Sequence, residues 1–164
     1  MYNNKPKTNI TIEPATAARL AEIPNIVGVK DSTGDFTNLL EYIRLTKDNP
    51  DFHVLVGRDT LIYAGLCCGA VGSIASCANV APRLVADIYD KYMAGDREGA
   101  LEAQFKLNPL RLATSMGTFP EVIKEGLMQM GFPVGRCLAP IKELNADQKV
   151  KLHQVLAQLG LVAD

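Results

Sequence analysis

The chain has 164 residues, of which 48% are hydrophobic and 21% charged, a composition that supports one globular domain with an apolar core. Its formal net charge is −1, and its 17 Lys and Arg residues are spread along the sequence, which excludes a basic nucleic-acid-binding surface from the expected functions. No apolar run approaches the roughly 18 residues that cross a bilayer, and the polar start lacks a signal-peptide core, so we expect a cytoplasmic protein without membrane contact.

Short apolar runs rich in β-branched residues alternate with helical patterns in the first half of the chain. The runs cover residues 26–29, 52–56 and 70–74. Near-continuous apolarity is typical of strands covered on both faces, and alternation of strands with helices predicts a parallel sheet. We therefore predict three parallel strands that end at Lys30, Gly57 and about Ile74.

Helical patterns follow these runs and fill the second half of the chain. Asp35 is a predicted N-cap, and Asp59 is a predicted cap for a helix that stops at Gly69. Asn145 and Gln148 have the spacing of a capping box. Further helices are predicted over residues 14–20, 82–94, 96–114 with a kink at Pro109, 120–130 and 146–159.

The cysteines do not have the spacing of a zinc site. Cys67, Cys68 and Cys77 lie in an apolar stretch, where a reduced cysteine behaves as a small hydrophobic residue. Cys137 stands alone, without a C-x-x-C pattern. We expect reduced, small core residues and no metal centre.

Lys30 is the first candidate for chemistry, because it follows an apolar run. In α/β barrels the working groups lie at the C-terminal ends of the strands. Partial burial there disfavours the ammonium form and frees the amine to attack a carbonyl. The pattern alone also fits a strand-end lysine that extends to solvent.

Four segments give Lys30 a more specific context. Residues 24–35, with the sequence PNIVGVKDSTGD, resemble the Schiff-base-lysine segment of the dihydrodipicolinate synthase and N-acetylneuraminate lyase family. Tyr2 and Asn3 resemble the start of its Y-N-x-P motif, 28 positions before the lysine as in the family. Residues 57–59 resemble its Gly-x-Asp segment, and residues 72–80 resemble its G-x-I-S-x-x-x-N segment.

The resemblance extends over essentially the whole chain and corresponds to the later part of the family's sequence. It implies an α/β fold, a partial (βα)8 TIM barrel with the last three strands in residues 1–93, and a C-terminal helical extension in residues 94–164. A full barrel needs roughly 200 residues or more. The family's first strands, and its Thr-containing loop for the pyruvate carboxylate, are expected to be absent from this chain. Open strand faces then predict a homo-oligomer, a tetramer in the family, or a complementing fragment.

The resemblance also implies a class I aldolase or lyase. Lys30 would form an imine with pyruvate or another 2-oxo acid, and Tyr2 would shuttle protons while a C–C bond to an aldehyde is made or broken. Gly57 would leave room for the substrate, and Ile74 would lie beside the pyruvate unit. No metal or cofactor is implied, because the imine serves as the electron sink.

Three polar residues are expected to contact substrate. They are Ser32, Asp59 and Ser76. The second substrate stays open among aspartate semialdehyde, sialic acid and a sugar-acid aldehyde, as does the reaction direction. Lys5 and Pro6 depart from the family's proline position, and Lys7 replaces the arginine of the synthase branch, whose bidentate clamp a lysine does not reproduce. Ser76 fits the sialic-acid lyase branch, and residues 122–126 resemble the sugar-acid aldolases.

Other interpretations compete with the enzyme. The chain as given is expected to be inactive alone, and it could be an incompetent barrel fragment or assembly module that needs the N-terminal half. A phosphate- or sugar-binding barrel is a weaker alternative, suggested by residues 69–72 and 31–35, but no P-loop is present. Asp59 could simply cap its helix, and Ile74 could be an ordinary strand residue.

Overall fold

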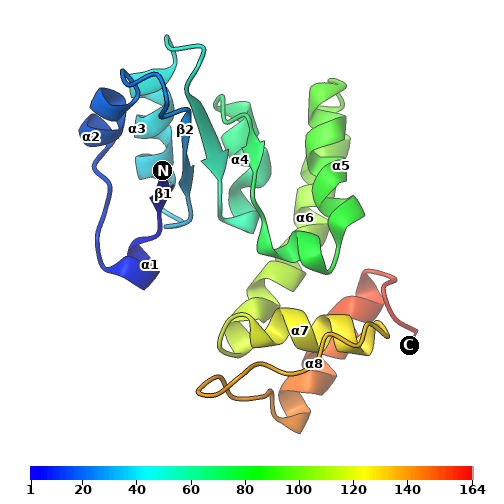
Figure 1. Ribbon diagram of the computed structural model, residues 1–164. Helices are drawn as coiled ribbons and strands as arrows, with labels where there is room; N and C mark the ends of the chain where they lie inside the picture. Colours follow the sequence, from blue (N-terminus) through cyan, green and yellow to red (C-terminus); the bar gives the residue numbers. More distant parts are fainter. Residues whose placement is uncertain (164) are drawn as a thin grey trace.

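The computed structural model describes residues 1–163 and contains one parallel sheet with helices packed on one face (Figure 1). The strands are β1 (Tyr2–Asn3), β2 (Gly28–Asp31), β3 (His53–Val56) and β4 (Gly72–Ser73), and they lie side by side in sequence order. The predicted parallel sheet is confirmed. The sequence does not predict β1, because two residues are too few to show an alternating pattern.

The register of the sheet sets which side chains share a face. Tyr2 lies opposite Lys30, Lys30 opposite Leu55, and Leu55 opposite Gly72. Successive side chains along a strand point to opposite faces, so these four residues line one face of the sheet. The buried residues of the strands lie on the other face: Asn3, Val29, Asp31, Val54 and Val56.

Helices cover only the face with the buried residues. They are α2 (Pro14–Leu20), α3 (Phe36–Thr46) and α4 (Ile62–Cys67), with the one-turn α1 (Lys5–Thr8) and the 3-10 turn η1 (Asp59–Leu61) at the ends of the strands. Asp35 caps α3 as predicted, accepting a hydrogen bond from the Asn38 backbone N–H at 3.2 Å. Gly65 of α4 packs directly on Val56, and Leu39 of α3 borders the same contact.

The opposite face of the sheet is open within the described residues. Tyr2 and Ile74, which lie on this face, are each 53% exposed. The expected open strand face is thus present in residues 1–163. In a closed barrel this face would be the interior, where side chains such as Leu55 and Ile74 would be covered.

The second half of the chain is helical, as predicted, and no strand occurs in residues 82–163. After the 3-10 turn η2 (Ser76–Asn79) come α5 (Pro82–Met93), α6 (Arg97–Ala113), the 3-10 turn η3 (Thr114–Met116), α7 (Glu121–Gln129) and α8 (Ala146–Gln158). Asn145 and Gln148 form the predicted capping box, and α6 continues through Pro109. None of the helices described in residues 1–163 is long and apolar enough to span a membrane.

The cysteines differ from expectation at two positions. Cys77 is fully buried, as predicted, and Cys137 is half-buried. Cys67 and Cys68 are exposed: they are the last residue and the C-cap of α4, directly after the buried Gly65 and Leu66. Apolarity of the stretch did not distinguish the packed turn of this helix from its end.

Candidate active site

A cavity of about 720 Å³ lies at the C-terminal ends of the strands. These ends face the side of the molecule on which α1 and α7 lie (Figure 1). All seven predicted site residues line the cavity: Tyr2, Lys30, Ser32, Gly57, Asp59, Ile74 and Ser76. The structure thus brings together residues from four strand ends, as the predicted shared cleft requires.

Two successive rows of residues form the floor of the cavity. The first row contains Tyr2 and Lys30, which lie opposite each other in β1 and β2. The second row follows two residues later along each strand and contains Ser32, Gly57 and Ile74, all on the open face. Backbone hydrogen bonds continue the ladder here, from Ser32 N to Asn3 O at 2.9 Å and from Gly57 N to Asp31 O at 2.7 Å.

The Lys30 amine lies over the ring of Tyr2, with Nζ 4.6 Å from the ring centroid. Lys30 is half-buried, and no carboxylate in residues 1–163 lies within ion-pair distance of its Nζ. The Tyr2 hydroxyl accepts a hydrogen bond from Asn4 Nδ2 at 2.9 Å, so its own proton is free to be donated into the cavity. The pair therefore combines a reachable amine with a proton donor.

Gly57 is required by the path of the Lys30 side chain. A side-chain carbon at this position would lie 2.8 Å from Lys30 Cε and 2.8 Å from the Asp31 carbonyl oxygen, and it would overlap Ser32 Oγ. Such contacts are closer than carbon atoms tolerate. The absence of a side chain leaves room for the lysine stem, whose Nζ then lies over Tyr2 in the cavity.

Asp59 does not cap a helix, so that expectation is wrong. The side chain is 2% exposed, accepts a hydrogen bond from the Cys77 backbone N–H at 2.7 Å, and is within 3.3 Å of Ser76 Oγ. Arg111 Nε lies 3.4 Å from its other oxygen. Asp59 therefore ties the end of β3 to η2 and α6, because a buried carboxylate is stable only with such partners.

Asp31 and Asn3 form a second buried polar contact, which the sequence did not single out. Asn3 Nδ2 donates to Asp31 Oδ1 at 2.7 Å, and Thr33 Oγ1 donates to Asp31 Oδ2 at 2.8 Å. Burial raises the pKa of Asp31, although the hydrogen bonds from Thr33 and Asn3 oppose the shift. The contact fixes β1 beside β2 and so holds Tyr2 opposite Lys30. The sequence did contain a signal for this contact, because a polar residue directly follows both Tyr2 and Lys30: Asn3 and Asp31.

The C-terminal helices supply one wall of the cavity. Arg111 of α6, Thr114 of η3, and the loop residues Gly117, Thr118 and Phe119 line it. Arg111 also donates to Thr114 Oγ1, which stabilises the end of α6. These residues were not predicted, since their approach to the strand ends depends on how α6 packs and not on local pattern. Arg58, which also lines the cavity, was visible in the sequence only as the variable position of the Gly-x-Asp segment.

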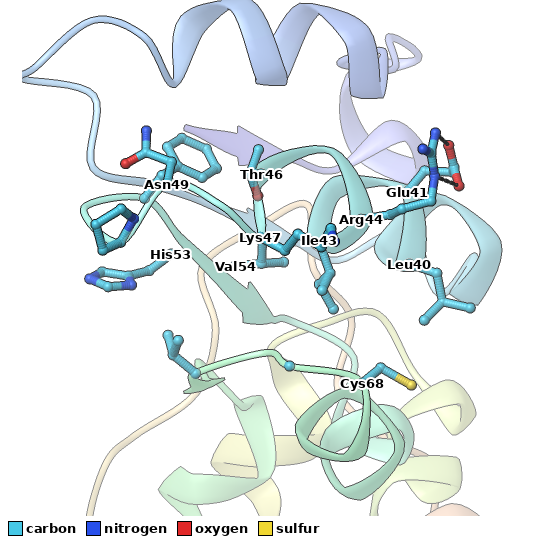
Figure 2. Close-up of a pocket in the computed structure, with 14 residues that line it drawn as sticks. Leu40, Glu41, Ile43, Arg44, Thr46, Lys47, Asn49, His53, Val54 and Cys68 are labelled. Carbon is cyan, nitrogen blue, oxygen red and sulfur yellow. Dashed lines mark hydrogen bonds and ion pairs between the residues drawn. The ribbon is translucent and has the colours of Figure 1, made fainter.

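Another cavity, of about 760 Å³, lies at the opposite end of the strands (Figure 2). Figure 2 shows it between the C-terminal part of α3, the start of β3 and the end of α4, with Ile43, Val54 and Cys68 on its walls. Its Arg44 and Glu41 pair with each other at 2.7 Å. Because the amine of Lys30 is at the other end, this cavity does not share its chemistry.

The chain resembles curated enzymes along almost its whole length. It is 37% identical over 163 residues to 4-hydroxy-tetrahydrodipicolinate synthase of Archaeoglobus fulgidus, covering 99% of this chain and 56% of the relative. It is 38% identical to the enzyme of the same name from Methanopyrus kandleri, covering 100% of this chain and 54% of the relative. The chain thus spans about half the length of the curated relatives it matches.

Solved structures agree. Dihydrodipicolinate synthase from Thermotoga maritima superposes with a TM-score of 0.94 at 32% identity, covering 98% of this chain and 55% of that chain. A prophage protein of the dihydrodipicolinic acid synthase family from Escherichia coli, solved in complex with pyruvate, gives 0.92 at 30% identity, with 98% and 55% covered. The fold is therefore part of a TIM barrel followed by C-terminal helices, as predicted. The dihydrodipicolinate synthetase family matches residues 1–159, and the chain belongs to this family.

Proposed function

We propose that this chain carries the Schiff-base-forming part of the active site of a class I lyase or aldolase. The observation that carries the proposal is the unpaired Lys30 amine over the ring of Tyr2, inside the cavity at the strand ends. The E. coli relative solved with pyruvate supports a 2-oxo acid as the first substrate.

The reaction follows from the two side chains. The Lys30 amine adds to the ketone of pyruvate or a related 2-oxo acid, and loss of water gives an imine. Removal of a proton from the adjacent carbon gives an enamine, and Tyr2 relays that proton. The enamine carbon attacks the carbonyl carbon of an aldehyde to form a C–C bond, and hydrolysis of the imine releases the product. The reverse sequence cleaves the same bond.

The remaining site residues have supporting roles in this proposal. Gly57 clears the path of Lys30, and Ile74 packs beside the imine-bound unit. Ser32 and Ser76 offer hydroxyls to the aldehyde-derived part, and Asp59 positions Ser76 through the carboxylate contact at 3.2 Å. The carboxylate of the 2-oxo acid is assigned to the loop that the family carries on earlier strands.

Borohydride trapping tests the proposal. The 164-residue chain, alone and joined to the N-terminal segment of the A. fulgidus relative, is incubated with pyruvate and borohydride, and peptides are analysed by mass spectrometry. We expect a reduced pyruvyl group on Lys30, absent from Lys30→Arg because a guanidinium stays protonated. Lys124→Arg is the control, since Lys124 Nζ donates to the Arg136 carbonyl outside the cavity. No labelling of the joined protein, or labelling at another lysine, contradicts the assignment.

Part of the exposed sheet face supports the second proposal, that this chain works only with a complementing fragment or other copies of itself. Tyr2 and Ile74, each 53% exposed, present apolar surface on that face. Apolar surface of a parallel sheet is normally covered by other protein elements, so a partner is expected there. Sedimentation of the chain should show association, or a shift to one heavier species when the N-terminal segment is added, and a stable compact monomer in both cases rules it out.

A further inference from the structure

Arg58 is a cation in the cavity that the reaction above does not use. It follows Gly57 at the end of β3, is half-buried, and lines the cavity. Its side chain lies along Gly34, in the loop after β2, where an added side-chain carbon would be 3.5 Å from Arg58 Nε and 3.7 Å from Cζ. Gly34 has φ +84°, so the glycine both forms the turn and leaves room for the guanidinium.

No protein group in residues 1–163 forms an ion pair or hydrogen bond with this guanidinium. No carboxylate lies within 4.0 Å of it, and no side-chain or backbone oxygen accepts a hydrogen bond from it. A guanidinium presents five N–H donors in a planar fork that matches a carboxylate or a phosphate. A partly buried fork without an acceptor is therefore suited to an anionic ligand.

The charges around the cavity point the same way. Lys7, Lys30, Arg58 and Arg111 line it, and Asp59 is the only acidic residue that residues 1–163 contribute to the lining. Asp59 is already engaged by Arg111, the Cys77 N–H and Ser76. Burial, and then the nearby charge of Arg111, lower the pKa of Arg58, and the charge of Asp59 only partly opposes them. The cavity lining thus carries more positive than negative charge.

The two cations have different neighbours. Lys30 Nζ lies over the Tyr2 ring, whereas the Arg58 side chain lies along Gly34 in the loop after β2. We propose, resting on the lyase function above, that Arg58 binds an anionic group, carboxylate or phosphate, on the aldehyde-derived part of the substrate. Arg58 would then supply the bidentate contact to the anionic group. Lys7 does not reproduce this contact, because it is an exposed point charge on α1.

The binding test uses the 164-residue chain and reads the Nε–Hε signal of Arg58 by NMR. Succinate and inorganic phosphate are the anionic probes, and succinamide is the neutral probe. We expect a saturable shift with at least one anion and none with succinamide. A stronger response to succinate assigns a carboxylate, and a stronger response to phosphate assigns a phosphate ester. The shift identifies the site directly, because each arginine gives its own Nε–Hε signal.

Variants distinguish a built site from general positive charge. Arg58→Gln should weaken anion binding about tenfold or more, the range expected for a charge-assisted hydrogen bond. Arg58→Lys should recover part of it, because charge returns without the fork. Arg83→Gln is the matched control, since the Arg83 side chain is 81% exposed on α5, and it should bind as wild type. Equal binding by Arg58→Gln and wild type, with both folded by circular dichroism, overturns the proposal.

Lys30 separates this proposal from the lyase proposal. Lys30→Ala should retain the Arg58 response, because the Lys30 amine lies over Tyr2 and the proposed anion contacts are made by the Arg58 guanidinium. If pyruvate is trapped on Lys30 but no anion moves the Arg58 signal, the anion proposal fails and the lyase stands. If anions bind at Arg58 but no lysine is trapped in the joined protein, the lyase fails and the anion site stands alone. If trapping itself shifts Arg58 and blocks succinate, Arg58 holds the pyruvate carboxylate and the proposal is wrong.

Discussion

Replacing Gly57 with alanine should damage both stability and imine formation. The added carbon would lie 2.8 Å from the Asp31 carbonyl oxygen and 2.8 Å from Lys30 Cε, and it would overlap Ser32 Oγ. Ser32 can rotate and Lys30 can withdraw, but the Asp31 oxygen belongs to the β2 backbone and is held in the ladder by the Gly57 N–H at 2.7 Å. The remaining way to relieve the close contact is for the ends of β2 and β3 to move apart.

The magnitude follows from these contacts. Overpacking of one carbon against a fixed backbone costs about 1–3 kcal/mol, and the lower chain entropy of alanine in the unfolded state returns about 0.4–1 kcal/mol. We expect a net loss of about 1–2 kcal/mol in the free energy of unfolding, measured by urea denaturation. Displacement of Lys30 from Tyr2 should also lower pyruvate trapping at Lys30.

Gly72→Ala is the matched control, because it lies on the same sheet face and its nearest neighbour would be Leu55 Cδ2 at 3.6 Å, an ordinary contact. Its stability should be unchanged or slightly higher. Adding Ser32→Ala to Gly57→Ala should recover part of the loss by removing Ser32 Oγ. If Gly57→Ala is as stable as Gly72→Ala and traps pyruvate normally, the reasoning about the lysine path is wrong.

Three further predictions concern the supporting residues. Asp59→Ala should lower the free energy of unfolding by about 2–3 kcal/mol in urea denaturation, because Arg111 and the Cys77 N–H lose their partner, with Asp59→Asn milder. Burial raises the pKa of Asp31, so the folded chain binds this proton more tightly than the unfolded chain does. The stability that this proton contributes is lost as the pH rises through the raised pKa. The free energy of unfolding of Asp31→Asn should therefore increase relative to wild type as the pH rises. Iodoacetamide should alkylate Cys67 and Cys68 in the folded chain and reach Cys77 only after unfolding, as peptide mass mapping would show.

Much of the fold follows from local pattern. β2, β3 and all of the longer helices have enough residues to show their periods and caps, and Asp35 and Asn145 cap the helices that the sequence assigns to them. β1 has two residues and no period, so only pairing with β2 defines it. The exposed thiols of Cys67 and Cys68 were missed for a similar reason, since composition does not say where a helix stops touching its neighbour.

The site residues also divide into those that a local sequence pattern predicts and those that depend on long-range contacts. Lys30, Gly57 and Ile74 were predictable because the ends of adjacent parallel strands meet at one edge of a sheet. The role of Asp59 was not, because its partners come from elsewhere: Ser76 and Cys77 lie 17 and 18 positions away, and Arg111 comes from α6. A carboxylate before a helix has a cap as its local option, and a stronger long-range set of donors overrode it.

Two buried carboxylates account for how the cavity keeps its shape. Asp31 joins β1 to β2 through Asn3 and so sets the Tyr2–Lys30 pair, which is the reacting end. Asp59 joins β3 to η2 and α6 and pairs with Arg111, whereas Arg58 has no ion-pair partner in residues 1–163. Neither carboxylate needs to touch substrate to matter. Asp31 is occupied by Asn3, and Asp59 is occupied by Arg111, so neither carboxylate pairs with Lys30 or Arg58. The Lys30 amine and the Arg58 guanidinium therefore remain available in the cavity, and the chemistry proposed for each depends on this.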